Sequence, residues 1–244
     1  MHSSWTLLTQ SPKNRCGSPL RFLLTGAYNK MIIKPTLSLQ TTTLWQYPSQ
    51  HYDSKNGTKV QGDPNYAGAT PSYIIWNVLQ RYTKDGDLVV DPMCGSGTTI
   101  DVCKDLGRQA RGFDLAPYRA DIEQADARKL PMLRNSADFV FIDPPYSTHL
   151  EYSEDPRCIG KLSAREGSYY QAMDLVIKEI HRVLRKRHYM ALYVSDSAQK
   201  GKSFQPIGFE LFARLCRLFE PIDIISVVRN NAKLKREHWH DEAV

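Results

Sequence analysis

The sequence predicts an α/β fold with a doubly wound, mostly parallel sheet. Apolar runs of strand length alternate along the chain with segments in which apolar residues recur every three or four positions, the spacing of an amphipathic helix. The runs at residues 88–90 and 139–142 are wholly apolar, which is typical of strands buried on both faces. Each is followed by a loop rich in glycine or proline. Because the carboxyl ends of parallel strands meet at one edge of a sheet, both loops are expected at the ligand-binding edge.

The other elements follow from periodicity and from residues that start or stop helices. Residues 1–30 carry no sustained period, so we expect a disordered extension, with Met31 as the true start of a single domain of residues 31–244. Aromatic residues among Pro, Gly and Asn at residues 41–68 indicate an ordered loop region that covers the core. A helix is predicted to start at Thr70, Pro71 and Ser72 and to close at Gly86. Further helices are predicted at residues 100–106, 173–184 and 209–219, strands at 110–114, 189–194 and 222–228, and one more strand leading into residues 125–131.

Composition sets broad limits on function. The 244 residues are enough for one domain with a sizeable core. The formal net charge is +6, but four basic residues lie in residues 1–30, and the rest of the chain has 28 basic and 26 acidic residues, a charge of only +2. Charge alone therefore gives little support for a nucleic-acid partner. The five cysteines form no CxxC pair, which favours reduced thiols in the cytoplasm and no metal site, and no apolar run is long enough to cross a membrane.

The loop after residues 88–90 reads Asp91, Pro92, Met93, Cys94, Gly95, Ser96, Gly97, Thr98 and Thr99. Its two glycines allow a sharp turn and a close approach of the backbone to a ligand. The threonines can begin a helix whose free N–H groups face that ligand. The pattern indicates a nucleotide or nucleoside cradle. A phosphate-binding P-loop would need a lysine after Gly97, and a dinucleotide fingerprint would need glycine where Ile100 stands.

The second loop reads Asp143, Pro144, Pro145 and Tyr146. Two consecutive prolines make a rigid turn between a carboxylate and an aromatic ring. This tetrapeptide, placed after four apolar residues, resembles the catalytic motif of S-adenosylmethionine-dependent methyltransferases that act on exocyclic amino groups. The glycine loop is similar to the cofactor loop of that family, and the resemblance covers roughly residues 41–228.

The resemblance implies S-adenosylmethionine as the cofactor. The helix starting at Thr70 and Pro71 matches the family's helix over the methionine end, and the glycine loop would hold the cofactor from Asp91 to Thr99. Asp114 stands about 20 residues past the loop, where this architecture places a carboxylate on the ribose hydroxyls. By resemblance, Asp126 accepts a hydrogen bond from the adenine amino group, with Ala127 beside it.

The same resemblance implies a mechanism. An exocyclic amino nitrogen is a poor nucleophile because its lone pair is delocalised into the ring. Hydrogen bonds from the amino group to the Asp143 carboxylate and the Pro144 carbonyl would orient it and stabilise the developing charge. Tyr146 would stack on the base, which must leave the duplex first. No Pro-Cys nucleophile occurs, which disfavours attack at cytosine C5.

We therefore expect a DNA methyltransferase of restriction-modification type that forms N6-methyladenine or N4-methylcytosine. The two motifs are too close in sequence for an intervening recognition domain, so recognition is expected from residues 147–167, a C-terminal part, a separate specificity partner or a homodimer. The chain is expected to be truncated and to lack the last antiparallel strand of the sheet. Two alternatives stay open, an RNA guanine-N2 methyltransferase and an inactive methyltransferase-like subunit that binds DNA or a partner.

Overall fold

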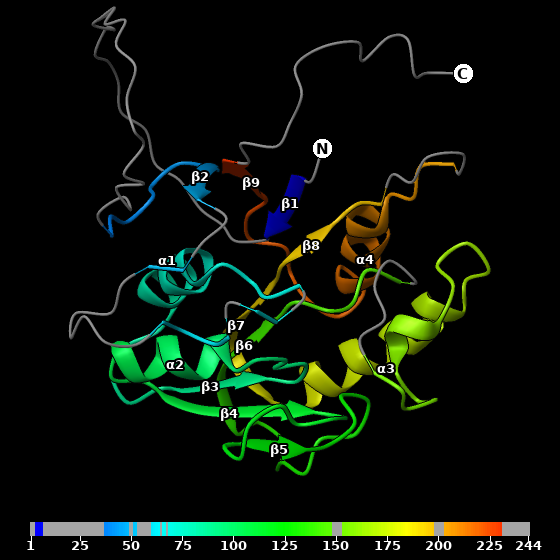
Figure 1. Cartoon of the computed structure of the whole chain (residues 1–244), viewed down its shortest axis with the longest axis horizontal. Helices are drawn as coiled ribbons and strands as arrows, with labels where there is room; N and C mark the ends of the chain where they lie inside the picture. Colours follow the sequence, from blue (N-terminus) through cyan, green and yellow to red (C-terminus); the bar gives the residue numbers. More distant parts are fainter. Residues whose placement is uncertain are drawn as a thin grey trace, which may run out of the picture.

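The computed structural model describes residues 3–6, 37–48, 51–52, 60–63, 65–66, 68–147, 153–197 and 203–230 (Figure 1). Its strands are β1 (Ser3–Thr6), β2 (Leu44–Pro48), β3 (Leu88–Asp91), β4 (Gln109–Asp114), β5 (Ile122–Gln124), β6 (Ala137–Ile142), β7 (Leu184–Leu192), β8 (Val194–Ser195) and β9 (Ile225–Asn230). Its helices are α1 (Ser72–Tyr82), α2 (Thr98–Asp105), α3 (Ser168–Val183) and α4 (Ile207–Leu215), with a short 3₁₀ turn η2 (Ile159–Lys161).

The central sheet has the strand order β5-β4-β3-β6-β7, and every neighbouring pair is parallel. The helices and strands predicted from residue 72 onward are therefore confirmed, with boundaries that shift by a few residues. The predicted doubly wound α/β fold is also confirmed. The glycine loop leaves β3 and the Asp-Pro-Pro-Tyr loop leaves β6, and these two strands are hydrogen-bonded neighbours. Both loops thus open on the same edge of the sheet.

Alternation along the buried strands explains why helices cover both faces. Val89, Phe139 and Phe141 pack into one core cluster with side chains of α1 and α2. The intervening residues Val90 and Val140 pack into a second cluster with α3 and α4. All of these strand residues are almost fully buried, as expected for a parallel sheet between two helical layers. Figure 1 shows α1 and α2 on one side of the sheet and α3 and α4 on the other.

A second sheet, in the order β2-β9-β1-β8, continues the first, because only Tyr193 separates β7 from β8. Strand β1 lies between β8 and β9 and is antiparallel to both, while β2 is parallel to β9. Two predictions are corrected here. Residues 41–68 contain the strand β2, whose Trp45 is fully buried in the core, and are not only a covering loop.

The second correction concerns the ends of the chain. We predicted disorder for residues 1–30 and a sheet without its last antiparallel strand. In the structure Ser3–Thr6 form an antiparallel strand, and the rest of residues 1–30 lies outside the described residues, as do residues 231–244. Local composition could not predict this, because the partners of β1 stand about 190 to 225 residues away in the sequence and are supplied by the tertiary structure.

Deleting residues 1–30 is expected to lower the free energy of unfolding by about 1–3 kcal/mol, since β8 and β9 lose the backbone partners that β1 supplies. Urea unfolding of the two chains measures the difference. A disulfide tests the register directly: Ser3→Cys should cross-link to Val228→Cys, its register partner, and not to Ser226→Cys, two residues out of register. Cys16 and Cys216 are replaced by serine in all of these chains. Equal stability with and without residues 1–30 would contradict the placement of β1.

Candidate active site

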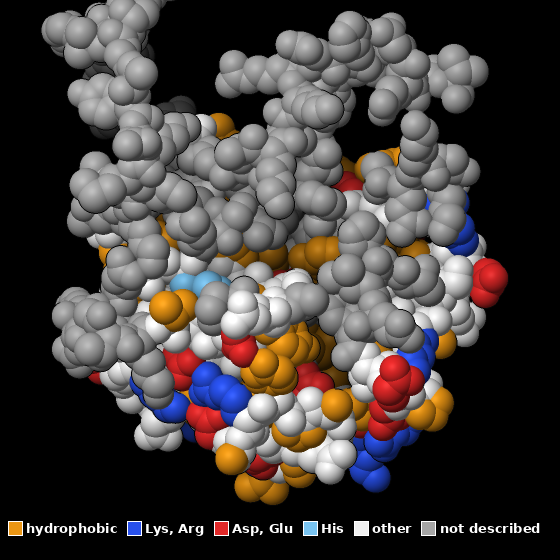
Figure 2. All heavy atoms as spheres, viewed as in Figure 1, with side chains coloured by type: hydrophobic (Ala, Val, Ile, Leu, Met, Phe, Trp, Pro, Cys, Tyr) orange, Lys and Arg blue, Asp and Glu red, His pale blue; other side chains and the backbone are white. Residues whose placement is uncertain are grey.

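An open pocket of about 890 Å³, counted out to its mouth, lies at the carboxyl ends of β3, β4, β5 and β6. Figure 2 shows the described surface hollowed near the ends of β3 and β4, where hydrophobic side chains border acidic ones. Most of the predicted site residues line this pocket: Thr70, Asp91, Pro92, Met93, Cys94, Gly95, Ser96, Thr98, Thr99, Asp114, Asp126, Ala127, Asp143 and Pro145. The topology therefore brings residues from four strand ends to one pocket.

Four predicted site residues do not form the pocket wall. Pro71 is the N-cap residue of α1, and Gly97 is the N-cap residue of α2. Pro144 is buried, and Tyr146 is half-buried and bonded to Asp143. The pocket is also lined by residues outside the predicted set, namely Tyr66, Gly68, Ala69, Leu115, Ala125, Ser153, Cys158 and Ile159. Leu115 and Ala125 could have been found as neighbours of Asp114 and Asp126. Ser153, Cys158 and Ile159 lie within residues 147–167, from which recognition was expected, and Tyr66 is one of the aromatic residues of the loop region at residues 41–68.

Asp143 is the centre of a small group of hydroxyls. The Thr70 hydroxyl donates a hydrogen bond to Asp143 Oδ2, and the Tyr146 hydroxyl donates to Oδ1 at 2.9 Å. Thr70 stands 73 residues before Asp143 in the sequence, so no local pattern predicts the contact. Both oxygens of the carboxylate therefore accept hydrogen bonds from protein hydroxyls that belong to different parts of the fold.

The glycine loop is anchored through Asp91, the last residue of β3. Its carboxylate accepts hydrogen bonds from the Thr99 hydroxyl at 2.5 Å and from the backbone N–H of Met93 at 3.1 Å. These bonds fold the loop back onto the first turn of α2. Gly95 has a positive φ of 49° and faces the pocket, with the Tyr66 ring about 3.1 Å from the position that a Cβ would occupy. Glycine is required there both by the backbone conformation and by the lack of space.

Burial raises the pKa of Asp91 to about 7, against the hydrogen bonds from Thr99 and Met93, which lower it. The unfolded chain loses this proton near pH 4 and the folded chain near pH 7, so the contribution of Asp91 to stability is complete below about pH 4 and is lost as the pH rises to about 7.

We therefore expect Asp91→Asn to gain stability relative to the wild type between pH 4 and pH 7, by about 4 kcal/mol in total. Urea unfolding of both proteins at pH 5 and at pH 8 measures this, because the other carboxyl groups cancel in the difference. A difference that does not change with pH would contradict the assignment.

Asp114 and Asp126 stand at or just after the ends of β4 and β5 and line the pocket. Asp114 accepts hydrogen bonds from the backbone N–H groups of Gly95 and Ala116, both at 3.0 Å, and so ties the glycine loop to β4. Arg128 donates two hydrogen bonds to the Asp126 carboxylate, from Nε to Oδ1 at 2.8 Å and from Nη2 to Oδ2 at 2.6 Å. Burial alone would raise the pKa of Asp126, but these hydrogen bonds outweigh it and hold the pKa below its usual value. The ribose and adenine roles of the two acids stay predictions.

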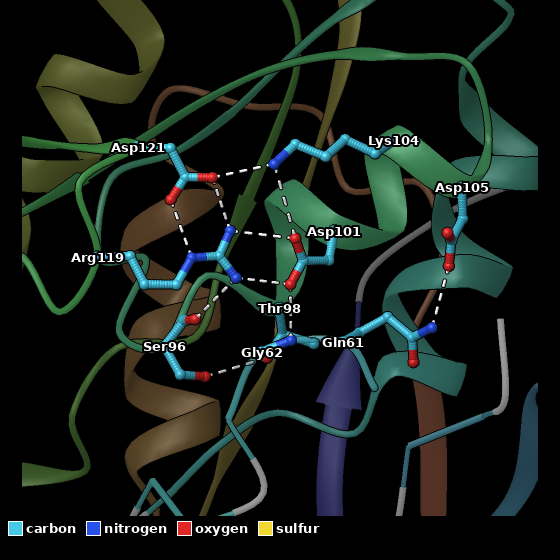
Figure 3. A network of polar contacts seen from close by, with 9 residues as sticks. All are labelled: Gln61, Gly62, Ser96, Thr98, Asp101, Lys104, Asp105, Arg119 and Asp121. Carbon is cyan, nitrogen blue, oxygen red and sulfur yellow. Dashed lines mark hydrogen bonds and ion pairs between the residues drawn. The ribbon is translucent and has the colours of Figure 1, made fainter. Parts of the chain in front are cut away.

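A polar network holds the glycine loop from behind (Figure 3), and sequence reasoning missed it. The Arg119 guanidinium donates to both oxygens of Asp101 at 2.6 and 3.0 Å, and also to Asp121. Asp101 in turn accepts the backbone N–H of Gly62 at 2.9 Å. The Asp101 side chain is only about 10% exposed, so this ion pair is largely shielded from water. The network joins α2, the loop after β4 and the segment before α1.

Within the described residues, no group of three or more His, Cys, Asp or Glu side chains is arranged to hold a metal ion. In the same part of the chain, no helix is both long and apolar enough to span a membrane.

Comparison with known proteins adds similarity to this geometry. Residues 27–125 match a family model described as DNA methylase, a stretch that contains the glycine loop and Asp114. This stretch is similar to N6/N4 DNA methylases. The chain is 30% identical over 86 residues to the Type II methyltransferase M.MjaII of Methanocaldococcus jannaschii, and 46% identical over 44 residues to the Type II methyltransferase M2.DpnII of Streptococcus pneumoniae.

These matches cover only parts of the proteins. They span 35% and 18% of this chain, and 16% of the length of each of the two relatives. Among solved structures, the [4+2]-cyclase SpnF is 17% identical, with 65% of this chain and 62% of that chain covered and a TM-score of 0.42.

Proposed function

We propose that this protein transfers a methyl group from S-adenosylmethionine to the exocyclic amino group of adenine (N6) or cytosine (N4) in DNA. One observation carries the proposal: Asp143 and the glycine loop, which leave neighbouring parallel strands, line the same pocket. A cofactor loop and a carboxylate that can accept hydrogen bonds from an amino group therefore border a single cavity.

The residues of the pocket fit the cofactor. Gly95, Asp114 and Asp126 line the pocket, where the two carboxylates would accept hydrogen bonds from ribose hydroxyls and an adenine amino group. The apolar side chains of Met93, Leu115 and Ile159 offer surfaces for the flat adenine ring. When bound, S-adenosylmethionine supplies an electrophilic methyl group. The described loop segment after Asp-Pro-Pro-Tyr lies against this pocket through Ser153, Cys158 and Ile159, while His149 lies outside the described residues.

The chemistry assigned to the chain needs two acceptors on the amino group of the base. Asp143 and the Pro144 carbonyl would receive its two hydrogen atoms, which orients the nitrogen and stabilises its developing positive charge. Pro144 is buried and Pro145 follows it, so the backbone at this position is rigid. Tyr146 would leave Asp143 to stack on the base.

DNA as substrate is supported by the family model, which is that of DNA methylases, and by relatives named as Type II methyltransferases. A base in duplex DNA must be flipped out of the stack to reach the pocket. A role in restriction-modification is consistent with the names of these relatives. A separate specificity partner, a homodimer and a cytoplasmic location stay predictions of the sequence.

The experiment that tests this function is methyl transfer from radiolabelled S-adenosylmethionine to unmethylated DNA and to total RNA, followed by digestion to nucleosides. Label in N6-methyladenine or N4-methylcytosine, absent with Asp143→Ala, is the expected result and identifies the base. Label only in RNA would overturn the DNA assignment. Cofactor binding without transfer to either nucleic acid would favour an inactive subunit.

A further inference from the structure

The hydrogen bond between Thr70 and Asp143 indicates a role for Thr70 beyond the cofactor binding that the sequence predicts. Thr70 precedes Pro71 and α1, and a residue before proline is held in an extended conformation. The start of α1 is fixed from the other side by Ser72, which is fully buried and accepts the backbone N–H of Tyr52 at 3.0 Å. The hydroxyl that reaches Asp143 Oδ2 is therefore carried by a rigid part of the fold.

We infer that Thr70 is a positioning residue for methyl transfer: its hydroxyl fixes Oδ2 of Asp143, so that Oδ1 is presented to the amino group of the base. The inference rests on the proposed function. Rotation of a carboxylate about its last side-chain bond has only weak intrinsic preferences, so a fixed donor on one oxygen determines where the other points. A hydrogen bond from a hydroxyl to a carboxylate is also short and strong, and it stabilises the charged form of the acid.

Thr70 and Tyr146 have different parts in this arrangement. Tyr146 donates to Oδ1, the oxygen that the base would use, and it is half-buried at the entrance of the loop after β6. Before a base binds, the Tyr146 hydroxyl donates the hydrogen bond to Oδ1 that the amino group of the base would donate later. Thr70 donates to the other oxygen and is not displaced by the base. The carboxylate would then keep its orientation while Tyr146 exchanges with the substrate.

The test separates positioning of Asp143 from contact with the cofactor. Thr70→Val removes the hydroxyl at nearly constant volume, and Thr70→Ser restores it. We expect Thr70→Val to lower kcat by about 10- to 100-fold, the size expected for the loss of a hydrogen bond to a charged group, with the Kd for S-adenosylmethionine within about twofold of the wild type. Thr70→Ser should recover most of the turnover. Thr42→Val, at an exposed threonine that does not line the pocket, controls for loss of a hydroxyl as such.

A second readout needs no activity. The antisymmetric stretch of the Asp143 carboxylate, isolated as an infrared difference spectrum against Asp143→Asn, should shift in Thr70→Val and return in Thr70→Ser. If wild type transfers no methyl group but this band shifts, the positioning contact stands and the proposed function fails. An unchanged band with unchanged kcat would overturn the inference. A weaker Kd for S-adenosylmethionine with unchanged kcat would also overturn it and favour the cofactor contact.

Discussion

Replacing Asp143 with asparagine is expected to lower kcat for methyl transfer by about 10²- to 10³-fold, the usual cost of removing one preorganised group that stabilises charge in a transition state. An asparagine side chain keeps the shape of the acid but has one acceptor oxygen in place of two. Its NH₂ group cannot accept the hydrogen bond that Thr70 or Tyr146 donates, and it would meet the amino group of the base as one donor against another. The negative charge that balances the developing cation would also be lost.

The measurement is single-turnover methyl transfer together with calorimetric titration of S-adenosylmethionine. Cofactor affinity should stay within a few-fold of the wild type, because Asp143 leaves β6 while the glycine loop leaves β3. Asp85→Asn is the matched control, since the Asp85 side chain is about 90% exposed and forms an ion pair with Arg108 away from the pocket. Wild-type turnover in Asp143→Asn would rule out a catalytic role for this carboxylate.

Replacing Gly97 with alanine is expected to destabilise the fold by about 2–4 kcal/mol and to weaken S-adenosylmethionine binding by at least about 10-fold. Gly97 has φ of +84°, a conformation that costs any other residue about 1–2 kcal/mol. A Cβ at this position would lie only 2.7 Å from Cζ of Arg119. The guanidinium would have to move. This would break its ion pair with Asp101 of α2 and its hydrogen bond to the Ser96 carbonyl of the glycine loop.

Gly86 is a close control for the cost of placing alanine in the left-handed backbone conformation. It has φ of +82°, and a Cβ there would meet nothing within 4 Å, so Gly86→Ala measures the cost of the conformation alone. Gly97→Ala should therefore cost clearly more than Gly86→Ala in urea unfolding. In an Arg119→Ala background the extra cost should largely vanish, as a double-mutant cycle would show. Equal costs for the two glycines in the presence of Arg119 would contradict the steric argument.

Much of the fold could be predicted from the sequence because the signals that specify it are local. Apolar runs such as residues 139–142 mark strands buried on both faces, and helical spacing marks α3. Alternation of strands and helices then requires a parallel sheet, and a parallel sheet brings the loops after β3 and β6 to one edge. Asp91 and Asp143 line one pocket because the strands that carry them are parallel neighbours.

The sequence by itself thus determined the parallel sheet, the edge that carries the site and the two motifs on that edge, since each depends on residues close together in the chain. Only the tertiary structure decided that Thr70 bonds Asp143, that Arg119 stands behind Gly97, and that Ser3–Thr6 pair between β8 and β9. The reason is physical: a hydroxyl, a guanidinium or an extended strand can bond any complementary group, and its partner is selected by the packing of elements distant in sequence.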